Sequence, residues 1–399
     1  MNNKIFITGI GIISAIGRNI EETLDSLRHS RSGVGDINHL DTIHKESLPT
    51  AEIKYSNTEL TELLGETDST RFTRSALLGM IAAREAATIA GIFPEKPDDL
   101  KIGVVSATTV GGMDKSEQYY YDFLKSDRYK IYIETHECSD STEKIADLLN
   151  TTDYLSTIST ACSSSANSII FAAQLIRHGI VDRVVAGGTD ALSRFTLNGF
   201  NALMILDKNP CRPFDKSRQG LNLGEGAGYV VLESEKAVKG RKIFCELKGY
   251  SNANDAYHQT ASSPEGTGAF LSMRDALENS RLDPLEIDYI NAHGTGTENN
   301  DLSEGIAIEK IFGNTVPMVS STKPFTGHTL GAAGGVEAVI SILSIEHQMA
   351  FPNLNFNHKM PELGFQPVRE IVTGRKIVNT LSNSFGFGGN GSSLIFSKY

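Results

Sequence analysis

The pattern of hydrophobic and polar positions predicts short buried strands separated by amphipathic helices. In the first part of the chain, apolar runs typical of strands lie at residues 4–8, 101–106, 154–159, 183–186 and 229–232. Helical spacing predicts helices at residues 21–29 and 71–90, and after Cys162 until Gly179. Residues 119–140 mix aromatic and charged side chains and match neither period.

The pattern restarts near residue 240, and its second part resembles the first. Predicted strands at 244–249, 287–291, 316–319, 377–381 and 394–396 alternate with helices at 268–280, 302–311 and 332–347. This alternation is typical of an α/β protein with mostly parallel, covered sheets. Each part contains a strand, a small-residue loop and a long helix, at 157–178 and 319–347, followed by a strand and a double glycine. We therefore predict two duplicated domains, residues 1–240 and 241–399, whose loops meet at one site.

Composition excludes several classes of function. The chain has 48 acidic and 37 basic residues among 399, and its net charge of -11 argues against nucleic acid and anionic membranes as partners. The scattered cysteines Cys138, Cys162, Cys211 and Cys245 predict neither a disulfide framework nor a zinc ribbon, which favours a reducing cytoplasm. Glu337 interrupts the most apolar stretch, residues 331–345, so we expect no membrane span. Gly9 and Gly11 lack the third glycine of a dinucleotide fingerprint.

Cys162 is a candidate nucleophile. It lies among serines and alanines where a buried strand gives way to a long helix. The partial positive charge of a helix N-terminus favours the reactive thiolate, and small neighbours leave room for a substrate. A lone cysteine in such a segment is more often an inert, buried side chain. The role of Cys162 therefore depends on residues elsewhere in the chain.

Two histidines, His293 and His328, stand in glycine- and threonine-rich loops that directly follow predicted strands. Strand ends are where α/β sheets place their sites, and a pair of imidazoles can donate hydrogen bonds and exchange protons near neutral pH. Taken singly, each is more often structural. Lys323 is either catalytic or a loop anchor, with Glu304 as its predicted partner. The aromatic and glycine-rich residues 383–390 form either a tight hairpin or a mobile loop whose N–H groups stabilise an oxyanion.

The motifs resemble one known family. Thr160-Ala161-Cys162-Ser163-Ser164, His293-Gly294-Thr295-Gly296-Thr297, Gly327-His328-Thr329-Leu330-Gly331-Ala332-Ala333-Gly334 and Phe385-Gly386-Phe387-Gly388-Gly389 occur in that order. On these motifs the chain resembles the elongating β-ketoacyl-acyl-carrier-protein synthases of the thiolase superfamily, most closely synthase II. Residues 212–215 and 224–228 extend the similarity over nearly the full length. The resemblance implies the thiolase fold, an α/β arrangement of five layers, αβαβα, from two duplicated halves, and a homodimer.

The resemblance also implies an acyltransferase of fatty-acid elongation, which performs a decarboxylative Claisen condensation. Cys162 would take an acyl chain from the phosphopantetheine of acyl-carrier protein, with the backbone N–H groups of Cys162 and Phe387 binding the oxyanion. His293 and His328 would hold the malonyl thioester, and Lys323 with Glu304 would form a supporting ion pair. No other cofactor is implied.

Further positions match the family's binding residues. The resemblance places Thr260, Thr295 and Thr297 against the pantetheine arm, Phe385 and Phe387 in a gating loop, and Val110 and Phe200 along the acyl pocket. It also implies a cation site of Asn291, Glu337, Ser382 and Asn383.

The chain departs from the family pattern at several points. Asn390-Gly391 replaces the usual Thr-Asn, Met204 replaces a basic residue used for carrier docking, and Val110 is smaller than the usual isoleucine. Carrier docking would then use other bases, for which the candidates are Arg71, Arg74, Arg128 and Lys130.

These departures leave other functions open. One is a condensing enzyme of a dedicated polyketide, polyene or aryl-polyene pathway. Another is a non-catalytic partner subunit like the chain-length factors, which usually lack the nucleophile that Cys162 supplies. A thiolase or a starter-type synthase that uses coenzyme A substrates would carry a different set of residues in place of the two histidines.

Overall fold

The computed structural model describes residues 4–95, 100–238 and 240–399. Among these residues, ten strands form one hydrogen-bonded sheet in the order β3-β2-β4-β5-β1-β6-β10-β9-β7-β8. The strands of the first half are β1 (Ile5–Ser14), β2 (Ile102–Ala107), β3 (Tyr154–Ile158), β4 (Arg183–Asp190) and β5 (Gly226–Ser234). Those of the second half are β6 (Cys245–Asn254), β7 (Tyr289–Asn291), β8 (Met318–Ser320), β9 (Asn379–Phe385) and β10 (Asn390–Ser397).

The two halves share one topology. Counted within each half, the strand order is third, second, fourth, fifth, first on both sides of the sheet. The halves join where β1 pairs with β6 in antiparallel register, Phe6 opposite Glu246 and Ile7 opposite Cys245. The repeat of the hydrophobic pattern therefore corresponds to a repeat in strand order.

The prediction of mostly parallel sheets is wrong for the inner strands. Only the outer three strands of each half, β3-β2-β4 and β8-β7-β9, are parallel. The remaining neighbours are antiparallel. In the second half the cause is visible: β9 and β10 are joined by a short hairpin, and a short connection can only reverse the chain direction.

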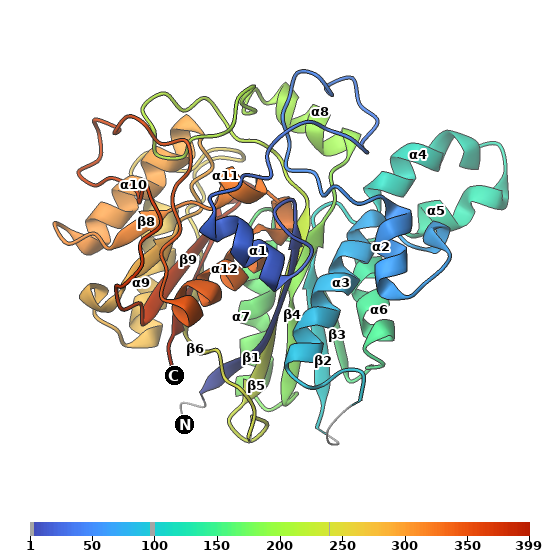
Figure 1. Cartoon of the computed structure of the whole chain (residues 1–399), viewed down its shortest axis with the longest axis horizontal. Coiled ribbons are helices and arrows are strands. Elements are labelled where there is room, and N and C mark those ends of the chain that lie inside the picture. The colour runs from blue at the N-terminus through green and yellow to red at the C-terminus, as the bar shows by residue number, and fades with distance from the viewer. Residues whose placement is uncertain (1–3, 96–99, 239) are drawn as a thin grey trace.

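The helices form the other layers of the molecule (Figure 1). On the first half, α3 (Arg74–Ile89) packs on β1, β4 and β5, and α6 (Ser139–Leu148) packs beside it. On the second half, α9 (Thr267–Ser280) covers β6 and β10, with α10 (Glu298–Phe312) against it. Between the halves, α7 (Ser164–Arg177) and α12 (Ala333–His347) pack on each other and on strands of both. Together with the two five-stranded halves of the sheet, these three helix layers make the five layers of the expected thiolase fold.

The remaining helices lie around this framework. They are α1 (Ile20–Arg28), α2 (Asn57–Leu64), α4 (Met113–Phe123), α5 (Lys130–Glu134), α8 (Arg194–Ala202) and α11 (Lys323–Thr326). The unassigned residues 119–140 supply parts of α4, α5 and α6. In α4 and α5 the aromatic rings pack on one another, as Tyr119 does on Tyr132 with 4.3 Å between ring centroids. Because these helices bury little of their surface against the core, their sequence carries no clear apolar period.

The glycines near the N-terminus serve packing. A Cβ at Gly9 would lie 2.1 Å from the carbonyl oxygen of Ala86, and one at Gly11 would lie 2.0 Å from that of Ala82. Both carbonyls belong to α3, so the glycines let α3 lie directly on β1. They explain why β1 extends to Ser14, beyond the predicted end at residue 8.

Helix α12 is the most buried helix of the central layer. One segment, Leu330–His347, is long and apolar enough to cross a membrane, but 89% of it is buried inside the protein. Every residue from 333 to 345 is buried, including Glu337. A helix that is apolar on all sides is typical of a buried position such as this one, between the two halves of the sheet.

Candidate active site

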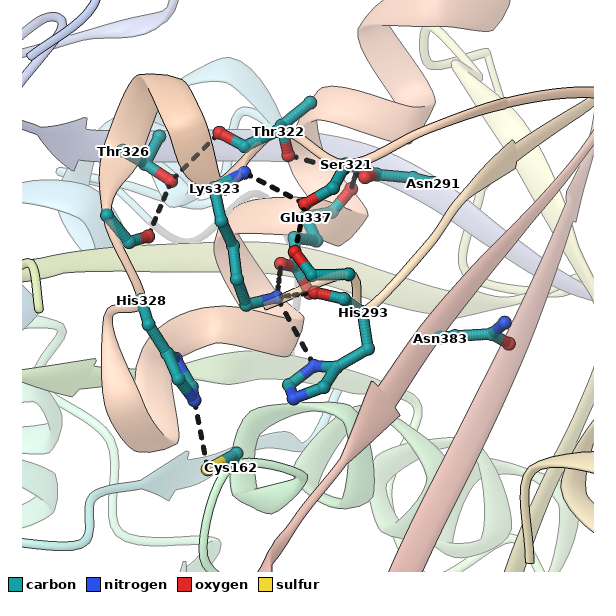
Figure 2. A network of polar contacts seen from close by, with 12 residues as sticks. Cys162, Asn291, His293, Ser321, Thr322, Lys323, Thr326, His328, Glu337 and Asn383 are labelled. Atoms are coloured by element: carbon teal, nitrogen blue, oxygen red, sulfur yellow. Dashed lines mark hydrogen bonds and ion pairs between the residues drawn. The ribbon is translucent and has the colours of Figure 1, made fainter. Parts of the chain in front are cut away.

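Cys162 lies at a sharp corner between β3 and α7. Ala161 before it has a φ of 54°, a left-handed conformation that is unfavourable for alanine. Helix α7 begins at Ser164, two residues after Cys162. The Cys162 side chain is 7% exposed, and its Sγ lies 3.1 Å from Nε2 of His328 (Figure 2). The predicted helix N-terminus is therefore present, and the loop of His328 meets Cys162, as expected if the loops of the two halves form one site.

The electrostatics of Cys162 differ from the prediction. Burial raises the pKa of the Cys162 thiol to about 11, although the charge of Lys323 and a hydrogen bond from the backbone N–H of Phe387 act to lower it. Desolvation disfavours the charged form of any buried group. Desolvation thus opposes the thiolate that the helix N-terminus favours, and with a pKa of about 11 the neutral thiol is the expected form of Cys162 near pH 7.

The two histidines are held as neutral hydrogen-bond donors. His328 Nδ1 accepts from the backbone N–H of Leu330 at 3.2 Å, and His293 Nδ1 lies 3.2 Å from the ammonium of Lys323. With Nδ1 occupied as an acceptor, the single proton of each neutral ring is on Nε2. Burial and the neighbouring Lys323 hold the pKa values of both rings well below their usual range. The rings meet edge to face with centroids 5.4 Å apart.

The predicted partner of Lys323 is wrong. Its ammonium pairs with Glu337 of α12, and also donates to the carbonyl oxygen of His293 at 2.5 Å (Figure 2). Glu304 instead accepts hydrogen bonds from the backbone N–H groups of His293 at 2.9 Å and Gly294 at 2.8 Å. Both acids therefore position His293. Glu304 binds the backbone N–H of His293, and Glu337 acts through Lys323, which contacts the His293 ring and carbonyl. Burial raises the pKa of each carboxyl to about 7.

A cavity of about 410 Å³ opens onto Cys162 and both histidines. The predicted pantetheine and gating residues line it, namely Thr260, Thr295, Thr297, Phe385 and Phe387, together with Phe200. Phe200 and Phe387 stack with ring centroids 5.8 Å apart. Val110 does not line this cavity; it belongs to an apolar cluster against which Phe200 packs.

Asp190 is a polar residue of the site that the sequence analysis missed. Its buried carboxylate accepts from the backbone N–H of Gly331 at 2.6 Å and from both the N–H and the hydroxyl of Thr109. It thereby ties the segment after His328 to the end of β2. Its position at the end of β4, two residues after the Gly187-Gly188 pair, was the available signal, because polar residues at strand ends favour a site.

The four candidates for carrier docking differ in exposure. Arg71, Arg128 and Lys130 are exposed. Arg74 is 8% exposed and bound by both carboxylate oxygens of Glu225, at 2.9 and 2.6 Å. Arg74 is therefore a structural ion-pair residue, and its prediction as a docking residue is wrong.

The four candidate cation ligands lie near Lys323 and Glu304. One oxygen of Glu337, Oε2, is buried and has no hydrogen-bond partner within the described part of the chain, as a cation ligand requires. Asn291 and Ser382 face each other between β7 and β9. Asn383 is engaged elsewhere, since its amide donates to Glu304 and its carbonyl accepts from Ser393. The carbonyl oxygen of Asn291 accepts only a longer hydrogen bond, from the Thr322 hydroxyl at 3.3 Å, so Glu337, Asn291 and Ser382 fit a small cation better than Asn383 does.

Comparison with known proteins relates this site to a family. The family model for the beta-ketoacyl synthase N-terminal domain matches residues 2–237, and that for the C-terminal domain matches residues 244–357. A curated relative, 3-oxoacyl-[acyl-carrier-protein] synthase 2 of Staphylococcus aureus (strain COL), is 32% identical over 100% of this chain and 99% of its own.

Two solved structures share the fold over the whole chain. The ishigamide ketosynthase/chain length factor has a TM-score of 0.93 and 30% identity, with 100% of both chains covered. The ketosynthase ApeO in complex with its chain length factor ApeC, from Xenorhabdus doucetiae, has a TM-score of 0.87 and 30% identity, covering 100% of this chain and 98% of the other. The matched domains, the full-length relative and the Cys162, His293 and His328 site agree: this chain belongs to the β-ketoacyl synthase family.

Proposed function

We propose that this protein is a condensing acyltransferase of fatty-acid elongation. It would join an acyl group, held as a thioester on Cys162, to a two-carbon unit from malonyl-acyl-carrier protein with loss of CO₂. The observation that carries the proposal is the placement of Cys162 Sγ 3.1 Å from His328 Nε2, beside a second neutral imidazole. The name of the Staphylococcus aureus relative supports acyl-carrier protein as the substrate carrier.

The first half of the reaction transfers the acyl group. Cys162 Sγ forms a bond to the thioester carbonyl carbon, and the carbonyl oxygen takes up the negative charge. The bond from that carbon to the pantetheine sulfur then breaks, and the thiol proton leaves with this sulfur. The backbone N–H of Phe387, which already points at Sγ, is placed to meet the oxyanion.

The second half makes the nucleophile. The bond between the malonyl carboxylate and its α-carbon breaks, CO₂ leaves, and the electron pair spreads onto the thioester oxygen. The Nε2–H groups of His293 and His328 stabilise this enolate. Neutral N–H donors suit the role, because in their resting protonation state they already donate hydrogen bonds to the oxygen on which the negative charge develops. The α-carbon then attacks the acyl carbon on Cys162, the C–S bond breaks, and the thiolate that is released takes up one proton from solvent.

A second candidate function is condensation in a dedicated polyketide or polyene pathway. The observation that favours it is the similarity to two structures described as ketosynthases with chain length factors. A non-catalytic partner subunit is disfavoured because Cys162, His293 and His328 are all present and line the same cavity.

Three properties of the proposed enzyme go beyond its chemistry. We expect a cytoplasmic homodimer in which no cofactor is needed besides the pantetheine of the carrier. Strand β3 supports self-association, because it is an edge of the sheet and its Leu155 is 41% exposed. A small cation held by Glu337, Asn291 and Ser382 would supply positive charge beside Lys323.

The test is an assay of the purified protein with malonyl-acyl-carrier protein and a series of saturated, unsaturated and aryl acyl carriers, with products identified by mass spectrometry. We expect β-ketoacyl carriers and CO₂ from saturated primers. Cys162→Ala should abolish condensation, whereas Cys245→Ala, a matched change at a cysteine buried in the core, should preserve it. Condensation by the Cys162→Ala protein would refute the assignment, and exclusive use of aryl or polyene primers would favour the second candidate.

A further inference from the structure

The oxyanion-binding groups come from two separate elements. Cys162 lies at the start of α7, and Phe387 lies in the hairpin between β9 and β10. The hairpin is closed by a hydrogen bond from the N–H of Gly386 to the carbonyl of Asn390 at 2.7 Å. A pair of donors acts on one oxyanion only if the two elements keep a fixed distance, because misplacement by about 1 Å costs on the order of 10²-fold in rate.

The side chain of Asn390 connects these two elements. Its Oδ1 accepts from the hydroxyl of Ser163 at 2.5 Å, from the amide of Asn167 at 3.0 Å and from the amide of Asn252 at 3.0 Å. Ser163 directly follows Cys162 and is fully buried. Asn167 lies one turn further along α7. A single amide oxygen, three residues beyond Phe387, therefore bonds to the residue next to the nucleophile.

The order Asn390-Gly391 determines where this amide points. Successive residues of a strand face opposite sides, so an amide at position 391 would point away from α7. Gly391 pairs with Phe385 across β9 and β10, and a Cβ there would lie 3.0 Å from the Phe385 ring. That ring in turn lies against His293, with centroids 5.8 Å apart. The departure from the family's Thr-Asn thus turns an amide toward the nucleophile and leaves room for the Phe385 ring.

We infer that Asn390 is a positioning residue for acyl transfer, which holds the Phe387 N–H in register with Cys162. The inference rests on the proposed function, since it concerns the first half of that reaction. It predicts an effect on the acylation of Cys162 and none on malonyl decarboxylation, because His293 and His328 lie on other loops and make no contact with Asn390 among the described residues.

The test compares Asn390→Ala with wild-type protein in two assays. Single-turnover acylation of Cys162 by an acyl-carrier protein, followed by mass spectrometry, should slow by about 10- to 100-fold. The carrier concentration for half-maximal rate and the rate of malonyl-carrier decarboxylation should each stay within about twofold of wild type, since the histidines are untouched. Ser392→Ala is the matched control, because Ser392 lies on β10, is buried, and bonds to Asn167 and Asn252, two of the donors to Asn390, but not to Ser163.

The outcomes separate the two proposals. An Asn390→Ala protein that acylates Cys162 at the wild-type rate, or that loses acylation and decarboxylation equally, would overturn the positioning role. Equal losses in Ser392→Ala would do the same. If Asn390→Ala does not fold, Asn390→Leu keeps a side chain of similar size without an acceptor for the three donors, and the same selective loss of acylation is expected. A wild-type protein that forms no acyl-enzyme would instead refute the proposed function.

Discussion

The titration of Cys162 in the free enzyme tests whether desolvation outweighs the helix N-terminus in determining the pKa of its thiol. Burial, offset by Lys323 and the Phe387 N–H, places the pKa of the thiol at about 11. A helix N-terminus stabilises an adjacent charge by up to about 2 kcal/mol, which corresponds to about 1.5 pKa units. Even with that full contribution, the thiol would titrate no lower than about 9.5. The thiolate fraction at pH 7 is then roughly 10⁻⁴ to 3 × 10⁻³.

Alkylation by iodoacetamide measures this fraction, because the thiolate is the reacting form. We expect the rate at Cys162, followed by peptide mass spectrometry, to rise about tenfold per pH unit from pH 7 to pH 9 and to level off only above about 9.5. The Cys162→Ala protein gives the background from the other cysteines. A plateau below pH 9 would refute the reasoning, because it would mean that the helix terminus and the nearby donors outweigh desolvation.

Two further predictions concern stability. Burial raises the pKa of Glu304 from 4.5 to about 7, so between these pH values the folded protein holds a proton that the unfolded chain has released. The free energy of unfolding of the wild-type protein should therefore fall as the pH rises from 5 to 8, by up to about 3 kcal/mol from this residue. Glu304→Gln removes that term, so urea unfolding should show the variant gaining on wild type over this range; a constant difference would contradict it. Gly11→Ala should lower the free energy of unfolding by about 1–3 kcal/mol in the same assay, since its Cβ would meet the Ala82 carbonyl of α3. Unchanged stability would contradict the packing of α3 on β1.

Local signals were sufficient for most elements and for the central residues of the site. Apolar periods predicted every strand and the long helices, because burial on a sheet or between two sheets imposes those periods directly. They did not predict the shorter helices α2, α6, α8 and α11, nor α4 and α5, whose aromatic rings pack on one another. Cys162, His293 and His328 stood out because each lies in a loop of small residues at the end of a predicted element.

The partners of charged groups could not be predicted from their positions along the chain. Lys323 was expected beside Glu304, but α12 brings Glu337 to it. Arginine is a residue type usually found at the surface, yet Arg74 is bound inside the protein by Glu225, which is 151 positions away in the sequence. In both cases the partner is chosen by how helices cross the sheet, which no local pattern encodes.

Hydrophobic periods and residue types are properties of neighbouring positions, and they were enough to predict the duplicated α/β layout and to single out Cys162, His293 and His328 as candidates for the site. The direction of the inner strands, the raised pKa of Cys162 and the placement of Asn390 against α7 follow from the packed structure alone. These depend on desolvation and on contacts between segments far apart in the chain, and such quantities exist only once the layers have packed.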